Sequence, residues 1–435
     1  MNGYIAFFTV TVSAIIWLVL LFTPKRWRIS ERWDIPDELP VMIRPLPTLS
    51  VIIPARNESS SLPITMPSWL KQGYPDSEII LIDDESSDGT AECAREISAP
   101  ANGKVQVLDG SPTPSGWSGK LWALEQGVRI SSGEWLLFTD ADIYHNPHLW
   151  QGLVAKAIAE QRELVSLMVL LDTRGFWAQF LIPAFVYFFH FLYPFAEVKN
   201  MRSGTSAAAG GCILVSRKAL NAIGGIASYC DAWIDDIALA ARVKRAGMPI
   251  SLSLTKSAIS IRPYFKLHEI WNMVARNAFA QLNYSWFLLL GTIIGLFILF
   301  VSPVIGMGIS VTGKTAILVP SGIALVSMSF TYLPTIRFFY LNVVRIFSLP
   351  VAGFLYQAMT VSSAINFVLK RREWRGSRRK KDKQNDSVKT TCLRITSFNS
   401  YKIAQSAIIK REGKITEPGI KVHLNAKDQK IVPEK

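Results

Sequence analysis

The chain has 435 residues, of which 49% are hydrophobic and 18% are charged, a composition that excludes an intrinsically disordered protein and allows a core in more than one domain. The formal net charge is +14, but residues 370–435 hold 19 of the 47 Lys and Arg and only 7 of the 33 Asp and Glu. The rest of the chain carries only +2. A basic tail is not a basic binding face, so we expect no nucleic acid partner.

The first predicted element is a membrane anchor. Tyr4–Phe22 contains 19 uncharged, mostly apolar residues, enough for a helix that crosses a bilayer core of roughly 30 Å. Three basic residues follow between positions 25 and 28, with no small-residue cleavage site before them. Because basic flanks favour the cytoplasmic side, we expect residues 1–24 to anchor the chain, residues 25–47 to form a linker, and the next domain to face the cytoplasm.

Apolar runs and helical patterns alternate through residues 48–175. The predicted strands are Thr48–Pro54, Glu78–Asp83, Lys104–Leu108 and Glu134–Phe138, and the predicted helices are Leu62–Gln72, Thr90–Ile97 and Lys120–Ile130. Near-continuously apolar strands that alternate with helices are typical of a mostly parallel sheet covered on both faces. The sequence therefore predicts a Rossmann-like α/β fold, in which ligands bind beyond the carboxyl ends of the strands.

Charged side chains follow three of these strands, which predicts a binding site at one rim of the sheet. They are Arg56 and Glu58 after the first strand, Asp83 and Asp84 at the end of the second, and Asp140 and Asp142 after the fourth. Any one of these groups alone would fit an ordinary turn. A turn, with a helix cap by Ser87 or Asp88, does not explain two adjacent carboxylates at the end of the second strand, which are suited to accept hydrogen bonds from a nucleobase and ribose.

The pair Asp140 and Asp142 is a candidate metal site. The two residues are one position apart, so an extended backbone points both carboxylates to the same side. Oxygen-only ligands favour Mg²⁺ or Mn²⁺, which commonly bridge to substrate phosphates. Isolated pairs of this kind also occur in helix caps and loops, but the place after an apolar strand favours the metal site.

The ordered motifs resemble those of family 2 glycosyltransferases. They are Pro54-Ala55-Arg56-Asn57-Glu58, Asp83-Asp84 with Ser87-Asp88-Gly89-Thr90, Gly119-Lys120 with Ala123-Leu124, Asp140-Ala141-Asp142, and Asp235-Asp236. The resemblance covers about residues 48–285 and implies the A-type nucleotide-diphospho-sugar transferase fold. A narrower likeness, to the hopene-associated glycosyltransferases of bacterial hopanoid gene clusters, rests on Gly116–Ala123, Leu181–Phe185, Ala207–Cys212 and Ile234–Asp236.

The resemblance implies a role for each candidate residue. Asp83 and Asp84 hold the nucleoside of a nucleotide-diphospho-sugar, Asp140 and Asp142 coordinate the metal, and Asp236 is the catalytic base beside Asp235. The remaining members of the nucleotide-sugar site are Pro54, Arg56, Glu58, Lys120, Asp140 and Arg276. Three alternatives stay open: a solvated helix N-terminus for Lys120, N-caps of the helix 237–246 for the two adjacent carboxylates, and lipid phosphate binding for Arg276.

The second half of the chain predicts membrane contacts. Residues 176–285 are expected to form the acceptor and catalytic half, and within it Phe176–Ala196 predicts either an aromatic element at the membrane surface or a buried helix hairpin. Residues 286–369 contain three long uncharged stretches, Trp286–Gly313, Thr315–Ile336 and Ile346–Leu369. Three crossings would place the basic cluster Lys370–Lys383 outside, so one stretch is expected to be broken, re-entrant or interfacial. Residues 370–435 are expected to be a disordered basic tail.

The predicted protein is a multi-pass enzyme of the bacterial cytoplasmic membrane. It transfers one sugar with inversion to a lipid acceptor in the bilayer, hopanoid-related by the narrower resemblance. Processive members of the family carry a Gln/Arg-x-x-Arg-Trp motif. In the corresponding stretch, Trp271–Asn277, no tryptophan follows Arg276, which favours a single transfer. The alternatives are another lipid acceptor (a polyisoprenyl phosphate, diacylglycerol or ceramide-like lipid) and a non-catalytic membrane scaffold or lipid-trafficking protein of the same fold.

Overall fold

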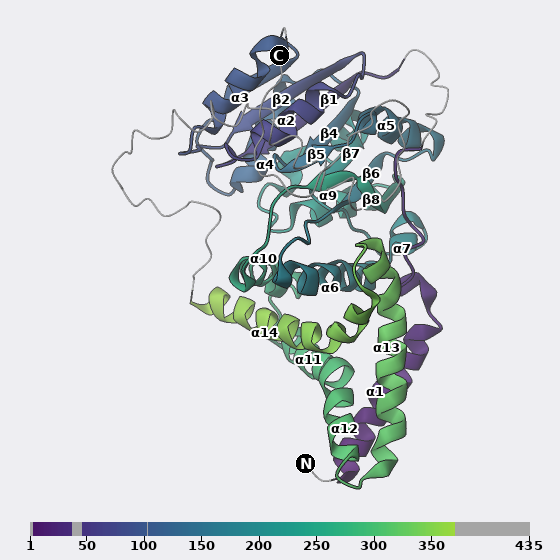
Figure 1. Ribbon diagram of the computed structural model, residues 1–435. Coiled ribbons are helices and arrows are strands. Elements are labelled where there is room, and N and C mark those ends of the chain that lie inside the picture. The colour runs from purple at the N-terminus through teal and green to yellow at the C-terminus, as the bar shows by residue number, and fades with distance from the viewer. Residues whose placement is uncertain (1–2, 37–45, 102, 370–435) are drawn as a thin grey trace, which may run out of the picture.

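A computed structural model describes residues 3–36, 46–101 and 103–369, which form an α/β domain, a layer of helices beneath it and a helical stem (Figure 1). The expected disordered tail, residues 370–435, lies outside the described residues, as does most of the second half of the expected linker. The three levels differ in hydropathy. The charged strand ends lie in the domain, whereas all but one of the long uncharged helices lie in the stem.

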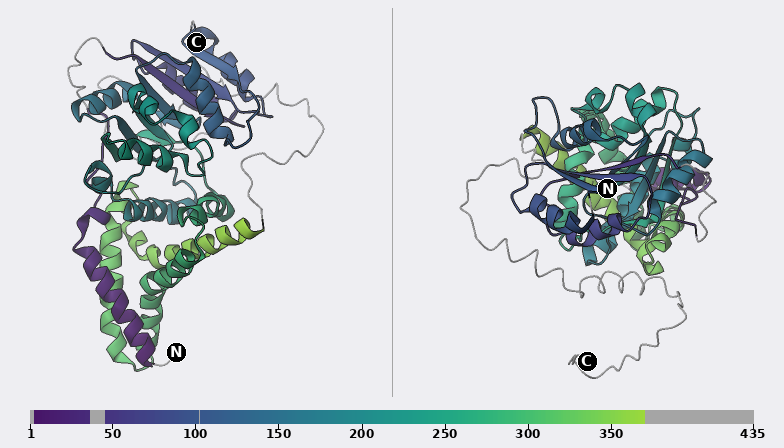
Figure 2. Two further views of the ribbon diagram at one scale, coloured as in Figure 1. Left: turned by 180° about the vertical axis from the view of Figure 1, so that it is seen from behind. Right: turned by 90° about the horizontal axis from the view of Figure 1, so that it is seen from above.

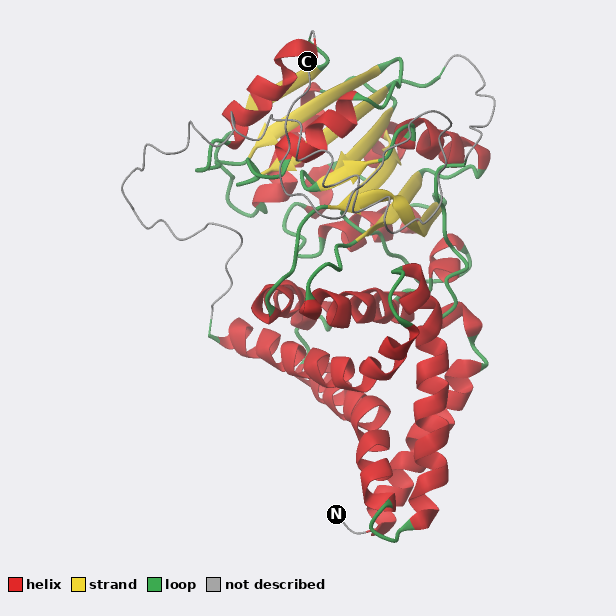
Figure 3. Ribbon diagram, viewed as in Figure 1, coloured by secondary structure: helices red, strands yellow, loops and turns green. Residues whose placement is uncertain are grey.

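One eight-stranded sheet forms the centre of the domain, with strand order β3-β2-β1-β4-β7-β6-β8-β5 (Figure 3). The strands are β1 (Leu49–Ala55), β2 (Ser77–Asp83), β3 (Val105–Asp109), β4 (Trp135–Thr139), β5 (Ile143–His145), β6 (Leu164–Leu170), β7 (Cys212–Ser216) and β8 (Ile250–Ser260). β7 runs antiparallel to both neighbours and β5 runs antiparallel to β8, whereas the other pairings are parallel. The mostly parallel sheet confirms the predicted α/β fold class.

Helices cover both faces of the sheet because its strands are apolar on both sides. In β1, Val51 and Ile53 pack on one face against Trp69 of α2, while Ile52 between them packs on the other face against Leu124 of α4. The domain helices are α2 (Leu62–Leu70), α3 (Thr90–Ser98), α4 (Gly119–Ile130), α5 (Leu149–Ala159), α7 (Phe195–Lys199), α8 (Arg217–Ala222) and α9 (Asp235–Arg245). With both faces covered, the polar strand ends are left open to ligands at the rim.

A layer of three helices separates the domain from the stem (Figure 1). These are α6 (Phe176–Leu192) and α10 (Leu267–Gln281), with α14 (Leu349–Val368) packed beneath them. The Trp271 indole of α10 donates a hydrogen bond of 3.0 Å to Ser362 of α14, and the Tyr356 hydroxyl of α14 donates one of 3.0 Å to the Leu181 carbonyl of α6. Within this layer α6 is one continuous helix from Phe176 to Leu192, not a hairpin of two helices.

The stem consists of α1 (Gly3–Leu21), α13 (Leu318–Phe338), and α11 (Trp286–Leu296) continued by α12 (Ser302–Ser310). A short π-helical segment, Phe297–Val301, joins the last two. Four helical segments of the described chain are long and apolar enough to cross a membrane: Tyr4–Leu21, Trp286–Ser310, Thr315–Phe338 and Val343–Val368. Figure 2 shows α1, α12 and α13 running together away from the domain, whereas α14 runs across that direction.

Candidate active site

The carboxyl ends of the strands bring most of the predicted site residues into one pocket of about 320 Å³. The predicted residues that line it are Pro54, Arg56, Glu58, Asp84, Lys120, Asp140, Asp142, Asp236 and Arg276. Asp235 lines a small hollow that adjoins this pocket and shares Lys120, Asp140 and Asp236 with it. Asp83 ends β2 beside Asp84, but its side chain is buried rather than turned into the pocket lining.

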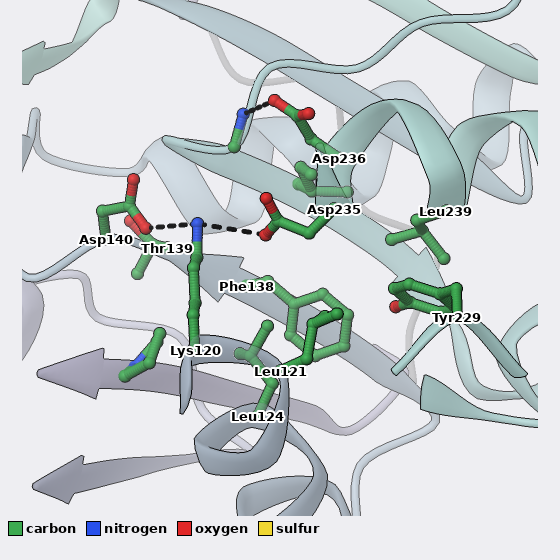
Figure 4. A pocket seen from close by; sticks show the side chains of 13 residues that line it. Lys120, Leu121, Leu124, Phe138, Thr139, Asp140, Tyr229, Asp235, Asp236 and Leu239 are labelled. Atoms are coloured by element: carbon green, nitrogen blue, oxygen red, sulfur yellow. Dashed lines mark hydrogen bonds and ion pairs between the residues drawn. The ribbon is translucent and has the colours of Figure 1, made fainter. Parts of the chain in front are cut away.

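Lys120 joins two carboxylates that lie far apart in the sequence (Figure 4). Its Nζ lies 2.9 Å from Oδ1 of Asp140 and 3.3 Å from Oδ2 of Asp235. Burial acts to lower the pKa of Lys120, but the two carboxylates outweigh it and the pKa is raised, so the ammonium group stays charged. The Lys120 side chain is only 19% exposed, which contradicts the alternative of a solvated helix N-terminus.

The backbone at Gly119 lies close to Asp84 and so positions Lys120, the next residue. It lies in the first turn of α4, where the Ser118 hydroxyl accepts a hydrogen bond of 3.3 Å from the Leu121 N–H. A Cβ at position 119 would lie only 2.7 Å from Oδ2 of Asp84. Glycine thus lets the helix N-terminus approach the carboxylate at the end of β2.

Asp236 lies in the first turn of α9 and has the features of a proton acceptor. Its Oδ1 accepts a hydrogen bond of 2.8 Å from the Ile237 N–H, and its Oδ2 accepts one of 2.8 Å from the Gly210 N–H. Burial, with the Asp235 carboxylate as the second cause, raises the pKa of Asp236 to about 7. A carboxylate that exchanges its proton near neutrality is suited to general-base catalysis. The contact with Ile237 lies inside the first turn of α9, whose N-cap is Ile234, so neither Asp235 nor Asp236 is the N-cap that the sequence left open.

Arg262 is a site residue that the sequence analysis missed. It follows β8, and its guanidinium lies 3.1 Å from Oδ2 of Asp142 and 2.7 Å from Oε1 of Glu58. The Ser260 hydroxyl also donates a hydrogen bond of 3.1 Å to Oδ2 of Asp142. Arg262 thereby joins the end of β1 to the candidate metal pair. The rule of charged residues at strand ends would have identified it, had β8 been predicted.

The end of β2, beside the pocket, carries an unsatisfied acceptor. Oδ1 of Asp83 is buried and has no hydrogen-bond partner among the described residues, while its Oδ2 accepts a hydrogen bond of 3.3 Å from the Ser86 N–H. Burial raises the pKa of Asp83. Beside it, Arg56 lies 3.2 Å from Oδ2 of Asp84. Buried polar atoms are normally paired, so Oδ1 of Asp83 is an exception within the described residues, next to the pocket but outside its lining.

The side of the pocket toward the helical layer is apolar. Phe185 and Phe189 of α6 and Met273 of α10 line it, within the same cavity as Asp142 and Asp236. A larger hollow of about 970 Å³ shares Arg262 and Arg276 with the pocket and extends to residues of α14. The site therefore offers charged groups to one part of a ligand and apolar side chains to another.

Comparison with known proteins identifies the domain. Residues 50–224 match the model of the family described as Glycosyl transferase family 2. These residues are a family 2 glycosyltransferase domain.

Two curated relatives match part of the chain. The 4,4'-diaponeurosporenoate glycosyltransferase of Staphylococcus haemolyticus (strain JCSC1435) is 36% identical over 122 residues, which are 28% of this chain and 31% of that protein. The PGL/p-HBAD biosynthesis glycosyltransferase of Mycobacterium bovis (strain BCG / Pasteur 1173P2) is 34% identical over 96 residues, 22% of this chain and 36% of that protein. The chain thus spans about a third of the length of these relatives.

A solved structure resembles nearly the whole chain. The mannosyltransferase PcManGT from Pyrobaculum calidifontis, in complex with GDP-Man and Mn²⁺, superimposes with a TM-score of 0.53 at 16% identity, covering 85% of this chain and 100% of that one. At this identity the likeness concerns the fold. The glycosyltransferase domain therefore has the predicted A-type nucleotide-diphospho-sugar transferase fold.

The carboxylates of the glycosyltransferase domain fit a substrate-bridged cation better than a closed protein cage. Within the described residues, no three His, Cys, Asp or Glu side chains come together as a metal-binding group. Asp140 and Asp142 each use one oxygen in an ion pair, with Lys120 and Arg262 respectively. Mg²⁺ is usually bound by one or two carboxylates together with substrate phosphates and water, and the pair Asp140 and Asp142 fits that donor set.

Proposed function

We propose that the chain is a membrane-bound inverting glycosyltransferase that transfers a single sugar from a nucleotide-diphospho-sugar to a lipid acceptor. The observation that carries the proposal is the pocket that holds Asp84, Asp140, Asp142 and Asp236 together beside an apolar wall of α6 and α10. Donor-binding groups, a base and a surface for an apolar acceptor thus share one cavity. The GDP-Man and Mn²⁺ named in the complex of PcManGT support the choice of donor and of a divalent ion.

The donor occupies the rim at β1, β2 and β4. Asp83 and Asp84 accept hydrogen bonds from the nucleoside, with Arg56 and Pro54 beside them, and Lys120 and Arg276 face the diphosphate. When bound at Asp140 and Asp142, Mg²⁺ or Mn²⁺ supplies positive charge that stabilises the departing nucleoside diphosphate. Arg262 holds Asp142 and Glu58 in place through its two ion pairs.

Asp236 removes the proton from the acceptor hydroxyl while the hydroxyl oxygen attacks the anomeric carbon of the sugar. The bond from that carbon to the diphosphate breaks on the opposite side, which inverts the anomeric configuration. Gly210 holds the Asp236 carboxylate through its backbone N–H, and a Cβ at this position would lie 3.3 Å from Nζ of Lys120 and 3.5 Å from Oδ2 of Asp236. General-base assistance is typically worth about 10²- to 10⁴-fold in rate.

The acceptor is a membrane lipid, and by the narrower sequence resemblance a hopanoid or related polycyclic lipid. Phe185, Phe189 and Met273 offer its apolar body a surface next to Asp236. The relative named for 4,4'-diaponeurosporenoate and the one named for PGL/p-HBAD biosynthesis support an apolar acceptor in general terms.

The protein spans the bacterial cytoplasmic membrane with α1, α11–α12 and α13, and α14 lies at the cytoplasmic surface. In this arrangement the glycosyltransferase domain and the start of the segment after residue 369 lie on the same side. The basic cluster Lys370–Lys383 is then cytoplasmic, as the positive-inside rule favours. The parity conflict found in the sequence is resolved if α14 is the late segment that does not cross.

A donor and acceptor screen tests the proposal. Detergent-solubilised full-length protein is incubated with single nucleotide-diphospho-sugars, Mn²⁺ and candidate lipids, and glycosylated lipid is detected by mass spectrometry. We expect one lipid product, lost with EDTA and reduced at least 100-fold in Asp236→Asn, which still binds donor. Asp231→Asn, a change at an exposed carboxylate nearby, is the control and retains activity. Product formation by Asp236→Asn at the wild-type rate contradicts the assignment of the base.

A further inference from the structure

A cluster of arginines lies where the stem meets the domain, apart from the active site. Arg28 and Arg32 follow α1, and Arg337 lies in the last turn of α13. With Ile29, Ser30, Pro334 and Phe338 they line a hollow of about 390 Å³. The hollow shares no lining residue with the glycosyltransferase pocket.

The charge of this hollow is only partly compensated. Arg32 is paired with Asp34 at 2.5 Å. Arg28 and Arg337 are exposed, and within the described part of the chain neither has a carboxylate at ion-pair distance. Guanidinium groups are the usual partners of phosphate because their N–H groups match its oxygens in pairs. The hollow therefore favours a phosphate-bearing anion.

An exposed apolar stripe leads along α13 to the same hollow. Val319, Ile323, Val326 and Phe330 are 65%, 37%, 70% and 53% exposed, and their spacing of four, three and four residues keeps them on one helix face. Continuing this spacing by four and three residues reaches Pro334 and Arg337, which line the hollow. Phe330 also contacts Trp27 edge-on, with ring centroids 5.7 Å apart. The stripe and the arginines thus form one continuous surface.

We propose that this surface, Val326 to Arg337 of α13 with Arg28, binds an anionic phospholipid. The phosphate lies between Arg28 and Arg337, and an acyl chain lies along Val326 and Phe330. Eleven residues separate Val326 from Arg337, which is about 16 Å of helix, close to half of a bilayer core of roughly 30 Å. One leaflet's acyl chain matches that length, whereas a free phosphate makes no use of the stripe. The inference rests on the membrane association proposed above and not on sugar transfer.

Native mass spectrometry of the full-length protein in detergent tests the site. Dioleoyl phosphatidylglycerol is titrated against dioleoyl phosphatidylcholine, with inorganic phosphate as a competitor. We expect the wild type to retain phosphatidylglycerol preferentially and Arg28→Gln/Arg337→Gln to bind it at least tenfold more weakly. Arg28→Lys/Arg337→Lys keeps the charge and most of the binding. The control, Lys104→Gln/Lys314→Gln, removes two exposed cations elsewhere and binds like the wild type.

Three results would each overturn the proposal. The wild type could bind phosphatidylcholine as well as phosphatidylglycerol, or the double Gln variant could bind phosphatidylglycerol as the wild type does. Displacement of the lipid by millimolar phosphate would instead indicate a site for free anions. Extraction of the wild type from membranes by sodium carbonate separates the two hypotheses. Release into the soluble fraction contradicts membrane insertion itself, whereas retention together with unaltered lipid binding by the double Gln variant contradicts only the lipid site.

Discussion

At the scale of single residues, the properties that suit Asp236 to be a base also reduce stability. The unfolded chain holds an ordinary aspartate with a pKa of about 3.9, whereas burial and Asp235 raise the folded value to about 7. Between these values the folded state keeps a proton that the unfolded state has lost, so stability falls as the pH rises through this window. Above pH 7 the loss of folding stability from Asp236 reaches its full size.

We therefore predict that Asp236→Asn is more stable than the wild type at pH 8, by at least about 1 kcal/mol. The uncharged amide avoids the repulsion from Asp235 and the cost of burying a charge, and this gain exceeds the cost of losing one of the two backbone N–H contacts, because an amide has only one acceptor oxygen. Thermal unfolding of both proteins at pH 5 and pH 8 measures the effect, and the advantage of the variant should grow between the two. The same advantage at both pH values would show that Asp236 does not titrate in this window.

Arg262 gives a second residue-scale prediction. Arg262→Met leaves Glu58 and Asp142 without their shared cation, and removing one partner of a buried ion pair is strongly destabilising. We expect a loss of about 2 kcal/mol or more in unfolding free energy and weaker binding of donor with Mn²⁺. Adding Glu58→Gln should restore part of the stability but not the donor binding, because Asp142 still lacks the ion pair with Arg262. Full recovery of donor binding would contradict the positioning role of Arg262.

Residue types and strand-end positions predicted most of the candidate site, because parallel strands bring their carboxyl ends to one rim. Arg262 was missed because no strand was predicted over residues 250–260, although serine alternates there with apolar residues, a pattern typical of a strand with one solvent face. In the structure both faces of β8 are covered, and Ser251 and Ser253 are only 2% and 4% exposed. The pattern gave no sign of this burial, which depends on helices that pack from distant parts of the chain.

At the scale of the elements, close packing of α12 depends on one of its glycines. A Cβ at Gly306 would lie 2.5 Å from Oγ of Ser321 in α13 and 2.8 Å from Cγ2 of Val10 in α1. The Ser321 hydroxyl is itself bound to the Ile317 carbonyl at 2.8 Å, so it cannot move away without losing that bond. Small residues that let helices approach are the usual basis of packing in membrane helices.

Gly306→Ala is accordingly expected to destabilise the stem by about 1–3 kcal/mol through overpacking. Gly308 lies in the same helix, and a Cβ added there would meet no atom of the described residues within 4 Å. Gly308→Ala is therefore a matched control and should be neutral or slightly stabilising. Thermal unfolding in detergent compares the two variants. Equal melting temperatures would mean that α12 does not pack closely in the membrane.

Hydropathy predicted the number of apolar helices but not the direction of each one. Val343–Val368 satisfies the length and composition of a span as well as Thr315–Phe338 does. What distinguishes α14 is its set of polar contacts with α6 and α10, such as the hydrogen bond of 3.0 Å that the Phe279 N–H donates to the Ser363 hydroxyl. Such contacts join segments more than 80 residues apart, and no local pattern in either segment identifies them.

At the scale of the whole molecule, the orientation of α14 decides which side of the membrane receives the C-terminal basic cluster. With α14 at the surface, the connection between α12 and α13 near Gly313 is external, while the chain after Leu369 begins in the cytoplasm. If α14 crossed, both positions would be external. The two arrangements therefore differ at one of two testable points and agree at the other.

Reporter fusions at these two points test the arrangement. Alkaline phosphatase fused after Gly313 should be active, because the enzyme folds only outside the cytoplasm, and green fluorescent protein fused there should be dark. After Leu369 the result should reverse, with fluorescence and no phosphatase activity. Activity of the phosphatase at both positions would show that α14 spans the bilayer, and the positive-inside rule would then fail for Lys370–Lys383. The Gly313 fusions are an internal control, since either arrangement predicts the same result there.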